Sequence, residues 1–145
     1  MLDIPKHIVY TIYRALSSYY NGKFEESAKL INGLLNDVSL KKYPYAQLEI
    51  KSLLALQYTL LKDFELFNQL SNSIQRQIRL FGKDSCENIQ LFLKILKIAT
   101  SEAKKEKAKK INAVVPRLNA ITVKYFAPTK LVKLDERFVN LLTEF

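Results

Sequence analysis

The side chains that could act as nucleophiles, general acids or metal ligands are few in this sequence. His7 is the only histidine and Cys86 the only cysteine, and neither has a neighbour in the chain with which it would form a catalytic pair. Adjacent carboxylates such as Glu25 and Glu26 point about 100° apart on a helix, so they cannot grip one metal ion together. Glycine-rich phosphate loops, paired cysteines and histidine–glutamate zinc motifs are absent from the sequence. We therefore expect a protein that is not an enzyme and that uses neither a metal ion nor a cofactor.

Basic side chains accumulate toward the C-terminal end, which indicates an acidic partner. The formal net charge is +9, and residues 101–145 alone carry ten basic and five acidic side chains. Because lysines neutralise phosphates and rings stack on bases, a basic helical domain that binds nucleic acid through its C-terminal half is the alternative hypothesis. Tyr125 interleaves there with Lys124 and Lys130, but most tyrosines fall at core-like spacing. Lysines spread singly over helix faces also suit a plain solubilising surface.

The composition indicates one helical domain. A chain of 145 residues with 48% hydrophobic residues can bury a core of its own, and three glycines with four prolines are too few for the many turns of a sheet protein. One cysteine allows no internal disulfide, which fits a reducing compartment. No apolar run approaches the roughly 20 residues that a membrane span needs. We therefore expect a single all-α domain over residues 1–145 in a cytoplasmic protein without a membrane span.

Apolar residues recur three or four positions apart through most of the chain, which is the spacing of amphipathic helices. About seven helices are predicted, and short connections make consecutive ones antiparallel, so that they form hairpins. The predicted hairpins span about 5–38, 45–81 and 85–125, and a capping helix spans 129–143. The helix over 45–62 is apolar nearly all round and should be the most buried element. Pro116 should kink or restart the helix that contains it.

The first hairpin repeats in the second at a shift of forty residues. Ala15 and Phe24 align with Ala55 and Phe64, so that a small residue is followed nine positions later by an aromatic one in both copies. A third, weaker copy fits at a shift of about forty-one. Repeats of this length that are built from two helices form solenoids, in which each hairpin buries its apolar faces against the next one.

The turn of the second hairpin carries a motif that suggests a family. Leu54, Ala55, Tyr58, Lys62 and Phe64 follow the order leucine-small-x-x-tyrosine-x-x-x-glycine-x-aromatic, with lysine at the glycine position. This order resembles the core of tetratricopeptide repeats, and the resemblance extends over most of the chain. It implies a tetratricopeptide-like right-handed superhelix of antiparallel hairpins. The chain is also similar to the C-terminal repeats of long bacterial proteins of this family whose function is unknown, which implies a fragment of a longer repeat protein.

The resemblance also implies where a partner binds. In such arrays the first helix of each hairpin lines a concave face, and the chain acts as a scaffold that binds a protein or peptide there. The implied concave-face residues are Tyr13, Leu16, Tyr20, Ser52, Leu56, Thr59, Gln90, Lys94 and Lys97. This groove is aromatic at one end and basic at the other, so we expect a peptide with an apolar anchor and an acidic group.

The first helix is expected to need a cover on its second apolar side. Val9, Tyr13 and Tyr20 fall on a different side from Ile8, which belongs to the core stripe. A preceding repeat, a second copy of the chain or a ligand are the candidates for covering that side. If nothing else covers it, we expect the chain to associate with itself through this helix.

Overall fold

A computed structural model describes residues 4–144, so the two ends of the predicted domain, residues 1–3 and residue 145, lie outside the described part. Every regular element of the described part is helical. The α-helices are α1 (Lys6–Tyr20), α2 (Phe24–Leu35), α3 (Pro44–Leu60), α4 (Phe64–Phe81), α5 (Glu87–Ser101), α6 (Lys104–Asn119) and α7 (Glu136–Thr143). The short 3-10 helices are η1 (Val38–Lys42), η2 (Lys83–Cys86) and η3 (Pro128–Leu131). The predicted all-α class is confirmed for these residues.

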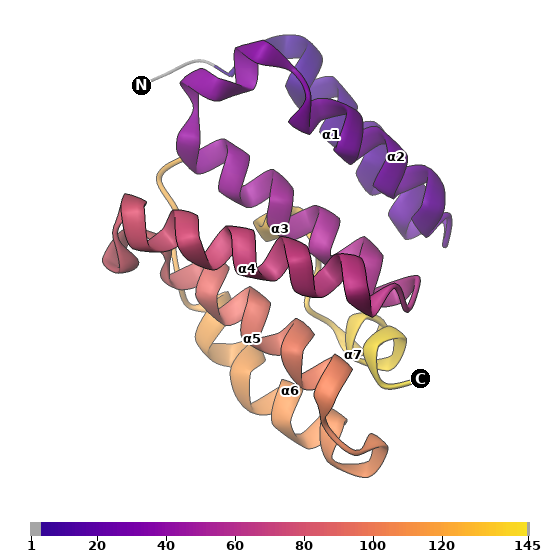
Figure 1. The fold of residues 1–145 in the computed structure, drawn as a ribbon. Coiled ribbons are helices and arrows are strands. Elements are labelled where there is room, and N and C mark those ends of the chain that lie inside the picture. Colours follow the sequence, from indigo (N-terminus) through magenta and orange to yellow (C-terminus); the bar gives the residue numbers. More distant parts are fainter. Residues whose placement is uncertain (1–3, 145) are drawn as a thin grey trace.

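The helices form a stack of antiparallel pairs. Figure 1 shows α1 and α2 at one end, α3 and α4 in the middle, and α5 and α6 at the other end. The last helix, α7, does not extend the stack, because it packs beside it against α6, with further contacts to α3 and α5. This arrangement makes α3 the central element, since it packs against α2, α4, α5 and η3.

The central helix α3 buries nearly its whole circumference. Leu53, Ala55 and Leu56 are fully buried, and several polar side chains of the helix lie in the core with them. Ser52 and Thr59 satisfy their hydroxyl groups within the helix by donating to carbonyl oxygens four residues earlier, at 2.8 and 2.9 Å. Because α3 has neighbours on several sides, its position requires an apolar pattern all round. It is the most buried helix of residues 4–144, as the pattern predicts.

The turn of the first hairpin recurs in the second. After α1, the N–H group of Gly22 donates to the carbonyl oxygen of Tyr19 at 3.0 Å, and the next N–H reaches one residue further back at 2.8 Å. After α3, Lys62 makes the same bond to Thr59 at 3.1 Å, and the next N–H again reaches one residue further back at 3.0 Å. This pair of bonds ends a helix in a left-handed residue, and φ is 77° at Gly22 and 60° at Lys62. The forty-residue shift therefore aligns the backbone as well as the residue types.

Two predicted helix boundaries lie elsewhere in the structure. The sequence predicts a second helix up to Val38, but α2 ends at Leu35 and Val38 is 74% exposed. The reason is Asp37, whose carboxylate accepts the N–H of Ser39 at 2.9 Å and so begins η1 inside the predicted loop. The fifth helix likewise begins later than predicted, at Glu87, because η2 precedes it.

The C-terminal part departs further from the predicted hairpin 85–125 and capping helix 129–143. The helix does not restart at Pro116, because α6 continues through this residue and ends at Asn119. The third hairpin is therefore shorter than predicted. The capping helix is split into η3 and α7, and Asp135 begins α7 by accepting the N–H of Phe138 at 3.1 Å.

We predict that Lys62→Gly stabilises the protein by about 0.5–1 kcal/mol, because a residue with a Cβ is strained in the left-handed region and glycine is not. Urea and thermal unfolding measure the difference. Gly22→Ala is the matched reverse change at the equivalent turn, where φ is also positive, and it should destabilise the protein by a similar amount. If Gly22→Ala destabilises and Lys62→Gly is no more stable than the wild type, the two turns are not equivalent in energy.

Candidate functional site

His7 and Cys86, the two side chains that the sequence singles out for chemistry, make contacts that support the fold. Nε2 of His7 lies 2.7 Å from a carboxylate oxygen of Asp37 and links the start of α1 to η1. Cys86 is fully buried, and burial raises the pKa of its thiol. A reactive thiol needs the opposite, a lowered pKa and access to solvent. Binding surfaces are therefore better candidates for function than these two residues.

The chain itself covers the face on which the sequence predicts a binding groove. Residues 120–135 (the C-terminal segment) run from α6 back across α3 to α7, with η3 packed on α3. Tyr20, at the end of α1, holds this segment twice. Its hydroxyl donates to the carbonyl oxygen of Leu131 at 2.9 Å and accepts the N–H of Lys133 at 3.0 Å. The segment therefore joins α1 to α3 along the predicted groove.

A buried carboxyl group fixes this segment to α3. Glu49 is 0% exposed, and its Oε1 accepts the backbone N–H of Thr129 at 2.9 Å and the hydroxyl of the same residue at 2.7 Å. Its Oε2 lies 2.7 Å from the hydroxyl of Tyr45 and 2.6 Å from the amide nitrogen of Asn88 in α5. Because a buried carboxyl group is costly unless its hydrogen bonds are made, these bonds fix α3, α5 and the C-terminal segment relative to one another.

Burial and hydrogen bonding act on the pKa of Glu49 in opposite directions. The hydroxyl of Tyr45 also lies 3.0 Å from Oδ1 of Asn88, so that Tyr45, Glu49 and Asn88 form a closed triangle of contacts. Burial raises the pKa of Glu49, while its hydrogen bonds with Tyr45, Thr129 and Asn88 oppose the rise. Burial is the larger of the two effects, so the pKa of this carboxyl group lies above its ordinary value.

Four of the predicted concave-face residues lie in the core. Ser52, Leu56 and Thr59 are 0% exposed, and Leu16 is 5% exposed. On α3 the reason is that α2, α4, α5, α7 and η3 all pack against this helix. The expectation that these four side chains line a groove open to a peptide is therefore corrected, since all four are buried.

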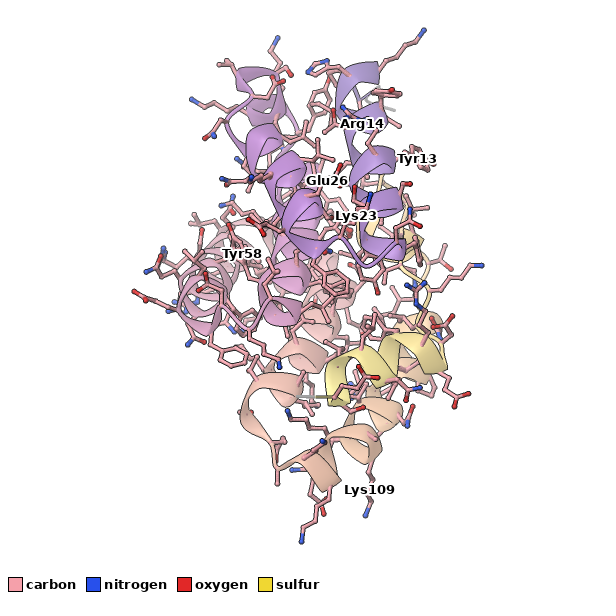
Figure 2. All side chains as sticks on the ribbon, turned by 90° about the vertical axis from the view of Figure 1, so that its right-hand side faces the viewer. Tyr13, Arg14, Lys23, Glu26, Tyr58 and Lys109 are labelled. Atoms are coloured by element: carbon pink, nitrogen blue, oxygen red, sulfur yellow. The ribbon has the colours of Figure 1, made fainter. Side chains whose placement is uncertain are left out.

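The other five predicted residues reach the surface, but not as one groove. Tyr13 is 55% exposed and projects from α1 into solvent (Figure 2). Tyr20 is half-buried by the C-terminal segment, which thus supplies part of the cover expected for α1. Lys94 and Lys97 are exposed and share a side of α5 with the half-buried Gln90. The structure therefore keeps Tyr13 and Tyr20 together on α1, whereas the α5 residues lie in the last pair of the stack (Figure 1).

A cleft remains between the end of α1 and the start of α7. Its volume is about 370 Å³, and it is lined by Tyr19, Tyr20, Leu131, Lys133, Asp135, Arg137 and Phe138. The guanidinium of Arg137 donates to the carbonyl oxygen of Tyr20 at 2.6 Å and lies 5.9 Å from the centre of the Tyr20 ring. Lys133 is exposed at the rim. The cleft thus combines aromatic rings with two cationic side chains and one carboxylate, that of Asp135.

Sequence reasoning missed this cleft. Lys133 and Arg137 fall within the predicted capping helix 129–143, whose polar side chains are expected to face solvent. In the structure Arg137 bonds a residue 117 positions earlier in the chain, and a contact at that separation leaves no periodic signal. The last helix is predicted from Thr129, whereas Asp135 begins it, and neither residue indicates the surface on which the helix packs.

An aromatic stripe on α1 faces solvent. Tyr10 is 65% exposed, and the guanidinium of Arg14 lies 5.9 Å from the centre of its ring. Tyr13 and Arg14 lie three and four positions after Tyr10, so the three residues share one face of the helix. Figure 2 shows Tyr13 and Arg14 together on α1. Exposed aromatic and arginine side chains are the residues that most often dominate the binding energy of protein interfaces.

Comparisons of the chain with protein-family models, with curated proteins and with solved structures find no match. None of the helices between residues 4 and 144 combines the length and the apolar character that crossing a membrane takes. Nor do three or more metal-binding side chains come together within that range. The resemblance to tetratricopeptide repeats therefore rests on the motif and on the two matching turns.

The stability of the protein should depend on pH through Glu49. Because burial raises its pKa in the folded state, the folded protein holds this proton more tightly than the unfolded chain does. The resulting stabilisation is fully present below the ordinary glutamate pKa of about 4.3 and is lost as the pH rises through the raised value. We predict that the wild type loses stability relative to Glu49→Gln over that range, since the amide does not titrate.

Urea unfolding of both proteins from acidic to neutral pH measures this difference. Glu26→Gln replaces an exposed glutamate of α2 and controls for the general effect of removing one carboxylate. A free-energy difference between wild type and Glu49→Gln that stays constant with pH would contradict a raised pKa of Glu49.

Proposed function

We propose that this chain is a non-catalytic module that binds a protein or peptide where α1 meets the C-terminal segment. The observation that carries the proposal is the cleft beside Tyr20, which has Lys133 and Arg137 in its lining. Tyr13 lies on the same face of α1, two turns before Tyr20, and most of its surface is open. The two cations of the cleft outnumber its one carboxylate, Asp135, and so suit a carboxylate of the partner. An exposed ring suits an apolar anchor.

The proposed partner is the kind of peptide that the sequence predicts, but it binds at a different surface from the predicted concave face. The partner is still a peptide with an apolar anchor and an acidic group. Its anchor contacts Tyr13, and its carboxylate meets Lys133 at the rim of the cleft. Ser52, Leu56 and Thr59 support this surface from the core and do not touch the partner.

We also infer that the hairpins belong to a tetratricopeptide-like right-handed superhelix. The support is the repeated turn, with Gly22 and Lys62 both left-handed at a shift of forty residues. Direct packing of α3 on α5, the first helices of adjacent hairpins, also fits such a stack. A partner of this array would use the border of the concave face, because the C-terminal segment fills its middle.

Nucleic-acid binding through the C-terminal half is the alternative, and one observation favours it. Lys104, Lys105, Lys109 and Lys110 are exposed on α6, and Lys109 points into solvent at the end of the stack (Figure 2). Lys107 departs from this solvated run, since it is 6% exposed and its pKa is lowered by burial and by Lys104. Because α6 carries no aromatic side chain on which a base could stack, we prefer the peptide.

Capture of partners on the immobilised chain, followed by affinity measurements on variants, tests the proposal. We predict that Tyr13→Ala with Lys133→Ala weakens binding at least about tenfold, because an anchor and a charge are both lost. Lys104→Ala with Lys105→Ala and Lys109→Ala is the control for loss of positive charge and should weaken binding less than about threefold. All five side chains are exposed, so the variants should melt like the wild type.

The reverse ranking would support the alternative. Capture that nuclease treatment abolishes, with an affinity that falls steeply as salt is added, would then identify nucleic acid as the partner. A captured protein that binds both variants as tightly as the wild type would exclude the proposed contact surface.

A further inference from the structure

Four apolar side chains form a second exposed surface at the C-terminal end of α4. Leu80 is 89% exposed, Tyr125 is 61% exposed and Phe81 is 37% exposed, and Pro44 is exposed with them. These residues (the α4-end patch) come from the start of α3, the end of α4 and the C-terminal segment. Apolar side chains from three separate segments that gather at the surface of a lysine-rich chain mark an interaction site.

Tyr45 holds the α4-end patch together from below. The centre of its ring lies 5.9 Å from that of Phe81 and 5.1 Å from that of Tyr125. Tyr45 itself is 5% exposed, and its hydroxyl belongs to the buried triangle with Glu49. Because both exposed rings rest on a buried one that cannot move freely, the patch is preformed and needs little ordering when a partner binds.

A small cleft opens in the patch. Its volume is about 270 Å³, and it is lined by Pro44, Leu48, Gln77, Leu80 and Phe81. Pockets for small molecules usually measure roughly 300–1,000 Å³, so this cleft suits one bulky apolar side chain better than a cofactor. The side chain of Leu80 lines the cleft and is mostly exposed, so it is free to pack over such a side chain.

Positively charged side chains lie next to the patch residues in the sequence. The exposed cations within three residues of a patch residue are Lys41, Lys42, Arg79, Lys83 and Lys124. Asp84 is the one carboxylate within the same distance along the chain. An apolar centre with a cationic rim complements a partner whose apolar side chain is flanked by carboxylates, since opposite charges favour approach and like charges oppose it.

We propose that the α4-end patch binds an acidic peptide segment, which inserts one bulky apolar side chain between Pro44 and Leu80. A second copy of this chain does not fit, because each copy has a net charge of +9 and would bring a cationic rim against another. The cleft favours a peptide over an anionic membrane, because a bilayer surface presents no side chain to fill it. The surface is distinct from the proposed contact at α1 and does not depend on it.

The test selects peptides from a random display library on the immobilised 145-residue chain. Enriched peptides should carry an excess of aspartate and glutamate around one leucine, isoleucine or phenylalanine. Leu80→Gln should weaken binding of a synthesised enriched peptide at least about tenfold. Arg79→Ala with Lys83→Ala should weaken it about three- to tenfold and reduce its salt dependence. Leu66→Gln, at an exposed leucine near the other end of α4, is the matched control and should leave the affinity unchanged.

Leu80 is so exposed that Leu80→Gln should melt like the wild type, and if it does not, the Arg79 and Lys83 variant decides the outcome. Peptides without an acidic excess, or equal binding to wild type and variants, would overturn the proposal. Leu80-dependent binding to vesicles that contain phosphatidylserine, with no peptide enriched, would overturn it in favour of a membrane contact. Because Tyr13 and Lys133 are unchanged in these variants, failure here leaves the proposed contact at α1 intact.

Discussion

Glu49 takes part in hydrogen bonds with three parts of the chain, and the relative positions of those parts depend on it. Its oxygens reach Asn88 in α5 and Thr129 in the C-terminal segment, 39 and 80 positions away in the sequence. Apolar packing alone would allow several registers, because burial of apolar surface has no preferred direction. A polar group left unpaired in the core costs about 1–3 kcal/mol, so only the register that completes these bonds is favourable. The network thus determines where the segment crosses α3.

That crossing decides which surfaces are left for binding. The segment fills the face on which Ser52 and Thr59 would meet a peptide, and the open surfaces lie at its two borders. At one border Tyr20 holds the segment and forms the wall of the cleft beside α7. At the other border Tyr125 of the segment rests on Tyr45 and is part of the α4-end patch. Both proposed surfaces therefore include residues of the segment, and the same buried carboxyl group supports both.

The local parts of the fold could be predicted from the sequence, because caps and turns involve residues a few positions apart. Asp63 accepts the N–H of Leu66 at 3.2 Å and begins α4, and Gly82, with a φ of +118°, ends it. The all-round apolar pattern of α3 likewise predicts a helix with neighbours on several sides. Of the two outcomes predicted for Pro116, a kink or a restart, the restart is wrong, since α6 continues through this proline and loses only the hydrogen bond that the missing N–H would make.

The candidate site could not be predicted in the same way, because an apolar or mixed face does not say which element covers it. Ser52 and Thr59 are residue types that commonly line a groove. Each hydroxyl, however, donates to a carbonyl oxygen of its own helix, so that these small polar side chains can be fully buried. Thr129 is a residue type that often begins a helix, yet its N–H and its hydroxyl both donate to Glu49. Glu49 itself was the available signal. A single acidic residue among the leucines of an apolar helix needs donors from elsewhere in the chain, so its presence predicts a long-range polar contact on that face.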